Sequence, residues 1–317
     1  MAHWVYDSES LYVGHAGKLH SIAPKSVAEL YLERSPEYGT TSITSPIRIS
    51  ANVTLAWNGG RLAAVCITAI WPSFAKIPNT LSPSIPTTTY EMIGFTVFWI
   101  ISVPFLFIRP EHFKRPFQFI SIYCGLGMLC MMIWSLSVAR GVGPIFSKGQ
   151  TVKDGSQFNT SWLMMAGINQ AIGQNAAGMT NSSDFSRYAK KSSHYLIGTI
   201  SCLWFVGALV SFVGLVTTAA CQKIYGKIYW NPPDLLMVMM NYGEGSSAAR
   251  AAVFFLALGF GLTSMFENIC GNSVAGGIDL AGLFPRYINI RRGAIITFLA
   301  AWVCFLASTI CLLMVSN

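Results

Sequence analysis

Long apolar stretches restrict what this chain of 317 residues can fold into. A helix needs about 20 predominantly apolar residues to cross the hydrocarbon core of a bilayer. Six stretches meet that length, at residues 89–108, 117–139, 160–180, 195–220, 250–276 and 293–315. A weaker seventh stretch, about 55–75, is either a span with a polar inner end, because Asn58 and Arg61 lie in its first turns, or the second half of a damaged helix. The sequence therefore predicts an all-α polytopic membrane protein with about seven transmembrane helices.

Composition supports this class and divides the chain into two parts. Hydrophobic residues make up 53% of the chain and charged residues only 11%, which is too apolar for a soluble domain of this length. Residues 1–50 differ, because they are polar, mixed in charge and without the apolar core of a signal peptide. We expect a cytosolic N-terminal tail of little intrinsic order over 1–50 and a transmembrane core over 51–317.

The positive charge of the chain predicts its orientation in the membrane. Basic residues gather in loop 109–116, in loop 181–194 and in the loop that holds Arg286, Arg291 and Arg292. Two spans separate each of these loops from the next, so the loops share one side, which the positive-inside rule makes cytoplasmic. We expect an integral membrane protein of the plasma membrane with a cytoplasmic N-terminus. No basic stripe lies on a soluble domain, so no nucleic-acid partner is expected beside the lipid bilayer.

The span 250–276 carries Glu267, Asn268 and Asn272, which a helix facing lipid would not tolerate. Each such group costs on the order of 2 to 3 kcal/mol in hydrocarbon, so these side chains normally face protein or a wet cavity. Asn268 and Asn272 are four residues apart and share a helix face, whereas Glu267 lies about 100 degrees round the helix. A carboxamide donates and accepts at once and suits a planar neutral heterocycle. This pattern indicates a transporter or channel.

Glu267 has two interpretations that the sequence leaves open. It is either a proton-carrying group or a structural acid paired with a cation such as Arg61.

The span 160–180 combines amides, among them Gln174 and Asn175, with three glycines. One interpretation is a broken helix whose amides form a substrate cradle, because unwound backbone inside a membrane is tolerated where it lines a cavity. The other is that the glycines allow close helix packing and the amides bond neighbouring helices.

Signatures of enzymes and metal sites do not occur in the sequence. The eight cysteines show no CxxC spacing, and no nucleophile elbow, phosphate-binding loop or zinc-protease motif is present. We expect neither an enzyme nor a bound cofactor or metal.

Several motifs occur in order over about residues 57–300 and resemble one family. They are WNGG (57–60), ITAIWPSFAKIPNTL (67–81), TYEMIGF (89–95), SSDFSRYAKK (182–191), YWNPPDLL (229–236) and GGIDLAGLFPRYINIRRG (276–293). The chain resembles the first family of nucleobase-cation symporters, specifically the fungal permeases for uracil, uridine, allantoin, thiamine and nicotinamide riboside.

This resemblance implies a LeuT-like inverted repeat of twelve helices, of which the spans here correspond to helices three to nine. It places Gln174 and Asn175 in the substrate-contacting sixth helix and makes Asn272 the eighth-helix asparagine that contacts the substrate ring. Phe266 and Glu267 replace the hydroxyl residues that bind sodium in a bacterial member. The resemblance therefore implies a proton as the coupling ion, carried by Glu267, in a secondary active transporter that imports a nucleobase, nucleoside or related heterocycle.

The chain departs from the family pattern at two places. Ala51 and Leu55 occupy the positions of a third-helix tryptophan and glutamine that contact substrate in the family. Residues 1–50 match neither of the first two helices, and helices ten to twelve have no counterpart. The alternative expectation is a truncated membrane protein of the same family, a fragment or pseudogene product, that does not transport alone.

Overall fold

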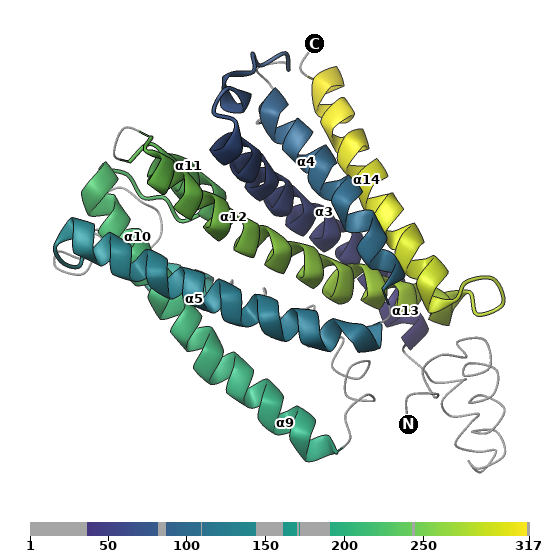
Figure 1. Cartoon of the computed structure of the whole chain (residues 1–317). Coiled ribbons are helices and arrows are strands. Elements are labelled where there is room, and N and C mark those ends of the chain that lie inside the picture. The colour runs from purple at the N-terminus through teal and green to yellow at the C-terminus, as the bar shows by residue number, and fades with distance from the viewer. Residues whose placement is uncertain are drawn as a thin grey trace.

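The computed structural model describes residues 37–81, 87–108, 110–143, 161–169, 171, 191–242 and 245–315, and within them every regular element is helical (Figure 1). The elements are α3 (Glu37–Ile70), η2 (Phe74–Lys76), α4 (Thr89–Ser102), η3 (Val103–Phe107), η4 (Pro110–Phe113), α5 (Lys114–Ala139), α9 (Ser192–Ser201), η5 (Cys202–Val206), α10 (Gly207–Tyr225), α11 (Pro232–Met240), α12 (Ser247–Glu267), η6 (Asn268–Val274), α13 (Ala275–Leu283) and α14 (Ile290–Val315). The prediction of an all-α polytopic membrane protein is confirmed.

Five of the described helical segments are long and apolar enough to cross a membrane: Ala51–Ile70, Thr89–Phe107, Lys114–Ala139, Ser193–Tyr225 and Ser247–Leu283. The helix α14 covers the predicted span 293–315 and begins three residues earlier. Of the predicted span 160–180, residues 161–169 and 171 are described, and they are helical.

The weak seventh stretch lies within one unbroken helix, whose part Ala51–Ile70 is long and apolar enough to cross a membrane. The helix α3 runs from Glu37 to Ile70 without interruption. Arg61 lies halfway along the candidate span Ala51–Ile70 rather than at an inner end. The first fourteen residues of α3, Glu37 to Ser50, belong to the part of the chain that was predicted as a tail.

The helix α3 lies at the centre of the described structure and packs against α4, α12, α13 and α14, while α5 packs against α10 and α12 (Figure 1). Glycines allow the closest of these approaches. A Cβ on Gly60 of α3 would overlap the backbone of Phe95 in α4, and a Cβ on Gly277 of α13 would overlap the backbone near Ile290 in α14. Both glycines belong to the motifs WNGG and GGID, so these motifs set interhelical distance.

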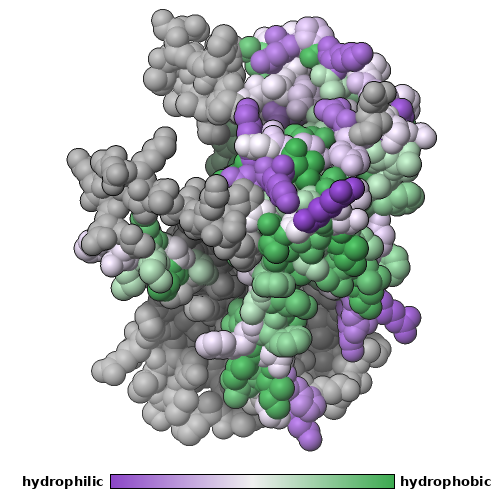
Figure 2. All heavy atoms as spheres, turned by 90° about the vertical axis from the view of Figure 1, so that its left-hand side faces the viewer, coloured by the Kyte–Doolittle hydropathy of each residue, from purple (hydrophilic) through white to green (hydrophobic). Residues whose placement is uncertain are grey.

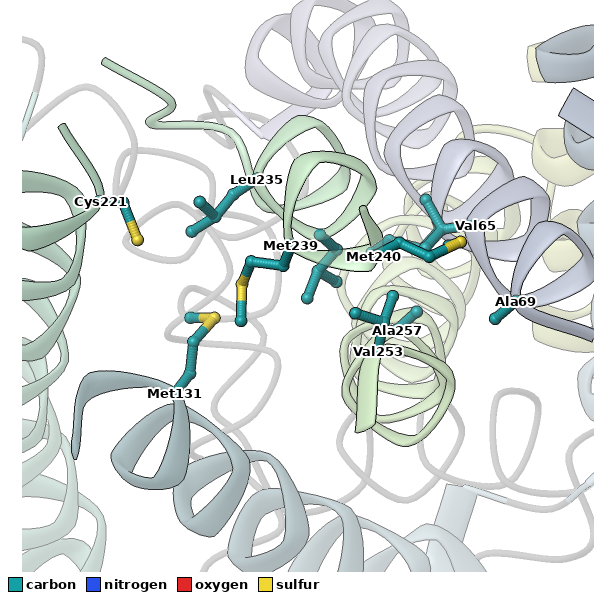
Figure 3. Close-up of a cluster of buried hydrophobic side chains, with 11 residues drawn as sticks. Val65, Ala69, Met131, Cys221, Leu235, Met239, Met240, Val253 and Ala257 are labelled. Carbon is teal, nitrogen blue, oxygen red and sulfur yellow. The ribbon is translucent and has the colours of Figure 1, made fainter. Parts of the chain in front are cut away.

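Two hydrophobic clusters hold the helices together. Figure 3 shows the first, in which α3, α5, α10, α11 and α12 contribute Leu62, Val65, Ala69, Met131, Cys221, Leu235, Leu236, Met239, Met240, Val253 and Ala257. The second is rich in aromatic rings and contains Ala56, Phe95, Phe98, Leu106, Phe113, Ile120, Met265, Phe266, Ile269 and Phe298. Close packing in both clusters fixes the rotation of α3 and α12 and so determines which of their polar side chains meet.

Contacts between helix ends bring the loops to two opposite ends of the structure. Arg250, in the first turn of α12, donates through Nε to the carbonyl of Ala69 (3.0 Å) and through a terminal nitrogen to that of Ile70 (3.2 Å), which end α3. The start of α12 therefore lies beside the loop after α3. At the other end, Phe113 before α5 packs on Phe266 near the end of α12. Trp99 of α4 stacks on Phe298 of α14, and η3 after α4 contacts α14, so loops 109–116 and 284–289 both lie toward the start of α14.

The outer surface carries the apolar side chains expected of a protein that faces lipid. Figure 2 shows a continuous hydrophobic area, with hydrophilic residues gathered mainly above and below it. Exposed large hydrophobic side chains are common on α5, α9, η5 and α10, and include Phe119, Ile122, Ile133, Leu196, Trp204, Phe205 and Phe212. Such side chains suit contact with hydrocarbon rather than with water.

Candidate functional site

Four polar side chains form one line of hydrogen bonds between α3 and the segment η6. Asn272 Nδ2 donates to Asn268 Oδ1 (2.9 Å), and Asn268 Nδ2 donates to Asn52 Oδ1 (3.0 Å). Asn52 Nδ2 in turn donates to Ser273 Oγ (2.9 Å). We call Asn272, Asn268, Asn52 and Ser273 the amide line.

The amide line is buried. The exposed fractions are 5% for Asn272, 2% for Asn268 and 0% for Asn52 and Ser273. Buried carboxamides are costly unless they are hydrogen-bonded, and each of these has its partner within the line. Asn272 ends the line and keeps the largest exposure of its four members.

The segment η6 is a π-helix that joins α12 to α13 without a break in the chain direction. It contains Asn268, Asn272 and Ser273, and its wider turn lets side chains that are close in sequence serve one site. Such π-helical insertions in α-helices occur frequently at functional sites. Gly271 and the density of polar residues are the local signs of this π-helix in the sequence.

Of the four predicted site residues, one lies in the amide line, one lies beside it, and two lie outside the described part of the chain. Asn272 lies in the amide line, where Asn268 shares its helix face as predicted. Gln174 and Asn175 lie outside the described residues. Glu267 precedes the line but is exposed, and among the described residues it makes no hydrogen bond or ion pair.

Asn52 is the site residue that the sequence reasoning missed. The family pattern directed attention to Ala51 and Leu55, which have no amide, but Asn52 beside them supplies one from α3. A signal was present, because Asn52 lies four residues before the buried Ala56 and so shares its helix face. A polar residue that continues a buried stripe within a span is a candidate for a buried polar contact.

A second polar contact, away from the amide line, joins Arg61, which directly follows the WNGG motif, to two other family-like motifs. Arg61 Nε donates to Glu91 Oε1 (2.9 Å), and a terminal nitrogen of Arg61 donates to Asp234 Oδ1. Glu91 Oε2 also accepts the backbone N–H and the hydroxyl of Thr88, which caps the start of α4. We call Arg61, Glu91 and Asp234 the Arg61 junction.

The Arg61 junction overturns one interpretation of Glu267. Arg61 pairs with Glu91 and Asp234, so the predicted alternative that Arg61 pairs with Glu267 is wrong. The physical reason is helix rotation: the Arg61 face of α3 turns toward α4 and α11, whereas Glu267 lies at the far end of α12.

Phe266 lies in an aromatic cluster near the C-terminal end of α12. Its ring meets those of Phe105, Phe113 and Phe117 edge-on, with centroids 5.6 to 5.7 Å apart. This position therefore contributes apolar packing and has no oxygen to offer an ion. Across the part of the chain that the structure describes, no cluster of His, Cys, Asp and Glu side chains is arranged to hold a metal.

Comparison with known proteins decides the family. A family described as permease for cytosine/purines, uracil, thiamine, allantoin matches residues 47–312. The chain belongs to this permease family. The match contains the amide line and the Arg61 junction, so both are features of the family region and not of residues 1–46.

Several curated relatives of the permease family are similar to most of the chain. Thiamine transporter THI72 of Saccharomyces cerevisiae is 33% identical over 81% of this chain and 43% of its own length. Nicotinamide riboside transporter 1 of the same yeast is 32% identical over 78% of this chain and 41% of its own length. Its uracil permease is 31% identical over 69% of this chain and 34% of its own length. The chain thus spans about two fifths of the length of such relatives, which are named as transporters or permeases and not as enzymes.

No solved structure matches the chain. The LeuT-like inverted repeat therefore stays a prediction.

Proposed function

We propose that this chain carries the substrate site of a secondary active permease that imports a nucleobase, nucleoside or related heterocycle such as uracil, uridine, allantoin or thiamine. The observation that supports the proposal most is the amide line, which ends in the carboxamide of Asn272. The family match and the names of the relatives agree with this class of substrate.

The chemistry of Asn272 suits such ligands. Its Nδ2 gives one hydrogen to Asn268, which leaves its second N–H and its Oδ1 for another molecule. Among the described residues no donor reaches Asn272 Oδ1. One planar ring edge with a donor beside an acceptor satisfies both groups at once, and no net charge is required of the ligand.

We also propose that uptake is coupled to protons and that Glu267 carries the proton. Glu267 is the acidic side chain nearest in sequence to the amide line, and an exposed carboxylate exchanges protons without dismantling a buried ion pair. The aromatic packing of Phe266 favours protons over sodium, because it removes a possible oxygen ligand from the same turn.

The orientation that we propose has a cytoplasmic N-terminus in the plasma membrane. The shared end of the basic loops around 109–116 and 284–289 supports this orientation by the positive-inside rule.

The test is uptake of labelled uracil, uridine, allantoin and thiamine by cells that express the full chain, compared with Asn272→Ala. One solute accumulates with the native chain, and Asn272→Ala weakens its apparent affinity by about 1 to 3 kcal/mol because a buried donor and acceptor pair is lost. Asn241→Ala, which removes an exposed amide after α11, is the control and leaves uptake unchanged.

The alternative is that the chain does not transport alone. Absence of accumulation for every solute, with the native chain present at the cell surface, supports this alternative and contradicts the permease proposal.

A further inference from the structure

The amide line has a single direction. At each of its links between carboxamides, the NH2 group of one asparagine meets the C=O oxygen of the next, from Asn272 to Asn268 and from Asn268 to Asn52. Turning over one amide alone would place two NH2 groups or two oxygens face to face. The three amides therefore keep or reverse their orientation only together, as a cooperative hydrogen-bond chain.

The residues at the two ends of the amide line differ in the hydrogen-bonding groups that they offer. A hydroxyl both donates and accepts, so Ser273 terminates the line in either direction, and in this structure it accepts from Asn52. Asn272 at the other end presents an acceptor and one N–H in fixed positions. If the line were reversed, Asn272 would present its whole NH2 group instead. Residues that do not touch a ligand thus determine what Asn272 offers to it.

We propose that Asn52 and Ser273 are positioning residues that set the hydrogen-bonding polarity of Asn272 and thereby select between two classes of heterocycle. One class has a ring N–H beside a C=O, as in uracil. The other has a ring nitrogen beside an exocyclic NH2, as in cytosine and the aminopyrimidine of thiamine. The two edges have the same shape with donor and acceptor exchanged, so an amide of fixed polarity pairs with only one of them when the rest of the site holds the ring in one orientation. This inference rests on the proposed function, because it requires Asn272 to contact the substrate.

Because the amide line is buried, we expect a large difference in affinity between the two classes of heterocycle. Asn52 and Ser273 have no exposure, so water does not replace a lost partner there. A site that hydrogen-bonds its ligand through buried groups rejects a mismatched analogue strongly, because the mismatch leaves those groups unpaired. Asn52 and Ser273 lie 221 residues apart in sequence and on different helices, so the polarity also depends on the packing of α3 against η6.

The experiment measures dissociation constants of uracil and cytosine for the purified full chain and reports their ratio. The native chain prefers one of the two. Asn52→Leu, which has a similar shape without hydrogen-bonding groups, shifts the ratio toward unity by about tenfold or more, the size of one lost hydrogen bond. Asn52→Asp keeps an oxygen for the NH2 group of Asn268 and retains the native preference. Ser273→Ala shifts the ratio in the same direction as Asn52→Leu.

A matched control separates polarity from general stability. Ser264 also bonds α12 to α3, through its Oγ to the carbonyl of Leu55 (2.9 Å), but it is not part of the amide line. Ser264→Ala lowers thermal stability about as much as Ser273→Ala does and leaves the ratio of the two dissociation constants unchanged. Should Asn52→Leu fail to fold, Asn52→Asp and Ser273→Ala decide the question.

The outcomes distinguish this inference from the proposed function. If the native chain binds one ring and the ratio stays at its native value in Ser273→Ala and in Asn52→Leu, the inference is overturned and the permease proposal stands. Equal affinity of the native chain for uracil and cytosine overturns the inference as well. If the native chain binds none of uracil, uridine, allantoin, cytosine or thiamine, the permease proposal fails and the inference fails with it.

Discussion

At the scale of single residues, Glu267 differs from the neighbouring amides in its exposure and in its hydrogen bonding. Asn268 and Asn272 are buried and bonded, whereas Glu267 is exposed and, within the described chain, without a polar partner. A carboxylate in that setting changes its charge without breaking other contacts, which is what a coupling group needs. The same exposure makes the residue a poor structural element.

We expect Glu267→Gln to flatten the pH dependence of uptake. Coupling to protons makes native uptake fall as the external medium becomes less acidic. Glutamine is neutral at every pH, so the variant loses that response while it keeps normal surface expression. The measurement is the initial uptake rate over acidic to neutral media. An unchanged pH profile would remove Glu267 from the coupling role, and Glu111→Gln, in η4, serves as the control for loss of one acid.

Arg61 has the opposite character, because its charge is compensated on two sides. The Arg61 side chain is 19% exposed, Glu91 is 12% exposed and Asp234 is 44% exposed. The Glu91 pair is thus the better shielded of the two ion pairs, and exposure weakens the Asp234 pair. Glu91 also holds the cap of α4, so loss of Arg61 disturbs the start of that helix.

We expect Arg61→Leu to lower the free energy of unfolding by about 1.5 to 3 kcal/mol, the range for hydrogen bonds to charged groups. The measurement is thermal unfolding of the purified chain in detergent. Lys223→Leu, at an exposed position near the end of α10, is the control and has little effect. Equal stabilities of Arg61→Leu and the native chain would show that the junction contributes nothing to the fold.

At the scale of elements, helix length was predictable from the sequence and helix rotation was not. The span 89–108 was predicted and the structure has Thr89–Phe107, because apolar length alone defines a membrane helix. The span 250–276 proved longer, as Ser247–Leu283, because η6 continues the helix through its polar residues. Which side chains meet across two helices depends on their rotation, and rotation follows from packing that no local pattern encodes.

In the candidate site, too, local spacing was predictable from the sequence, whereas contacts between distant helices were not. Asn268 and Asn272 were found from their spacing, because residues four apart on a helix share a face. Asn52 was missed because its partners are more than 200 residues away in sequence. The partners of Arg61 were missed for the same reason.

We expect the packing of α3 on α4 to be intolerant of a single methyl group at Gly60. Gly60→Ala overlaps the backbone of Phe95, so the helices must separate, at a cost of about 1 to 3 kcal/mol for overpacking. Gly125→Ala in α5 is the matched control, because a Cβ there meets no atom within 4 Å. The measurement is thermal unfolding of both variants, and the prediction fails if the two unfold at the same temperature.

At the scale of the whole molecule, the distribution of loops predicts which residues face the outside of the cell. Lys227 follows α10, at the end of the structure away from the basic loops, and Arg286 lies in the loop between α13 and α14. Both are exposed, so a cysteine at either position is accessible to a reagent in water.

We expect Lys227→Cys to react with a membrane-impermeant maleimide on intact cells, and Arg286→Cys to react only after the cells are permeabilised. The comparison is made against the native chain, which reports the labelling of its own cysteines. Labelling of Arg286→Cys on intact cells would invert the proposed orientation.

The separation of Asn52 from its partners in sequence has a consequence for biosynthesis. Asn268 follows Asn52 by 216 residues, which takes roughly 10 to 40 s to synthesise at about 5 to 20 residues per second. During that interval α3 has already left the ribosome, and the asparagines that will bond it do not yet exist. A carboxamide is poorly tolerated in hydrocarbon. We therefore expect the first half of this chain to stay beside the insertion machinery, or against another protein, until the second half arrives to pair with it.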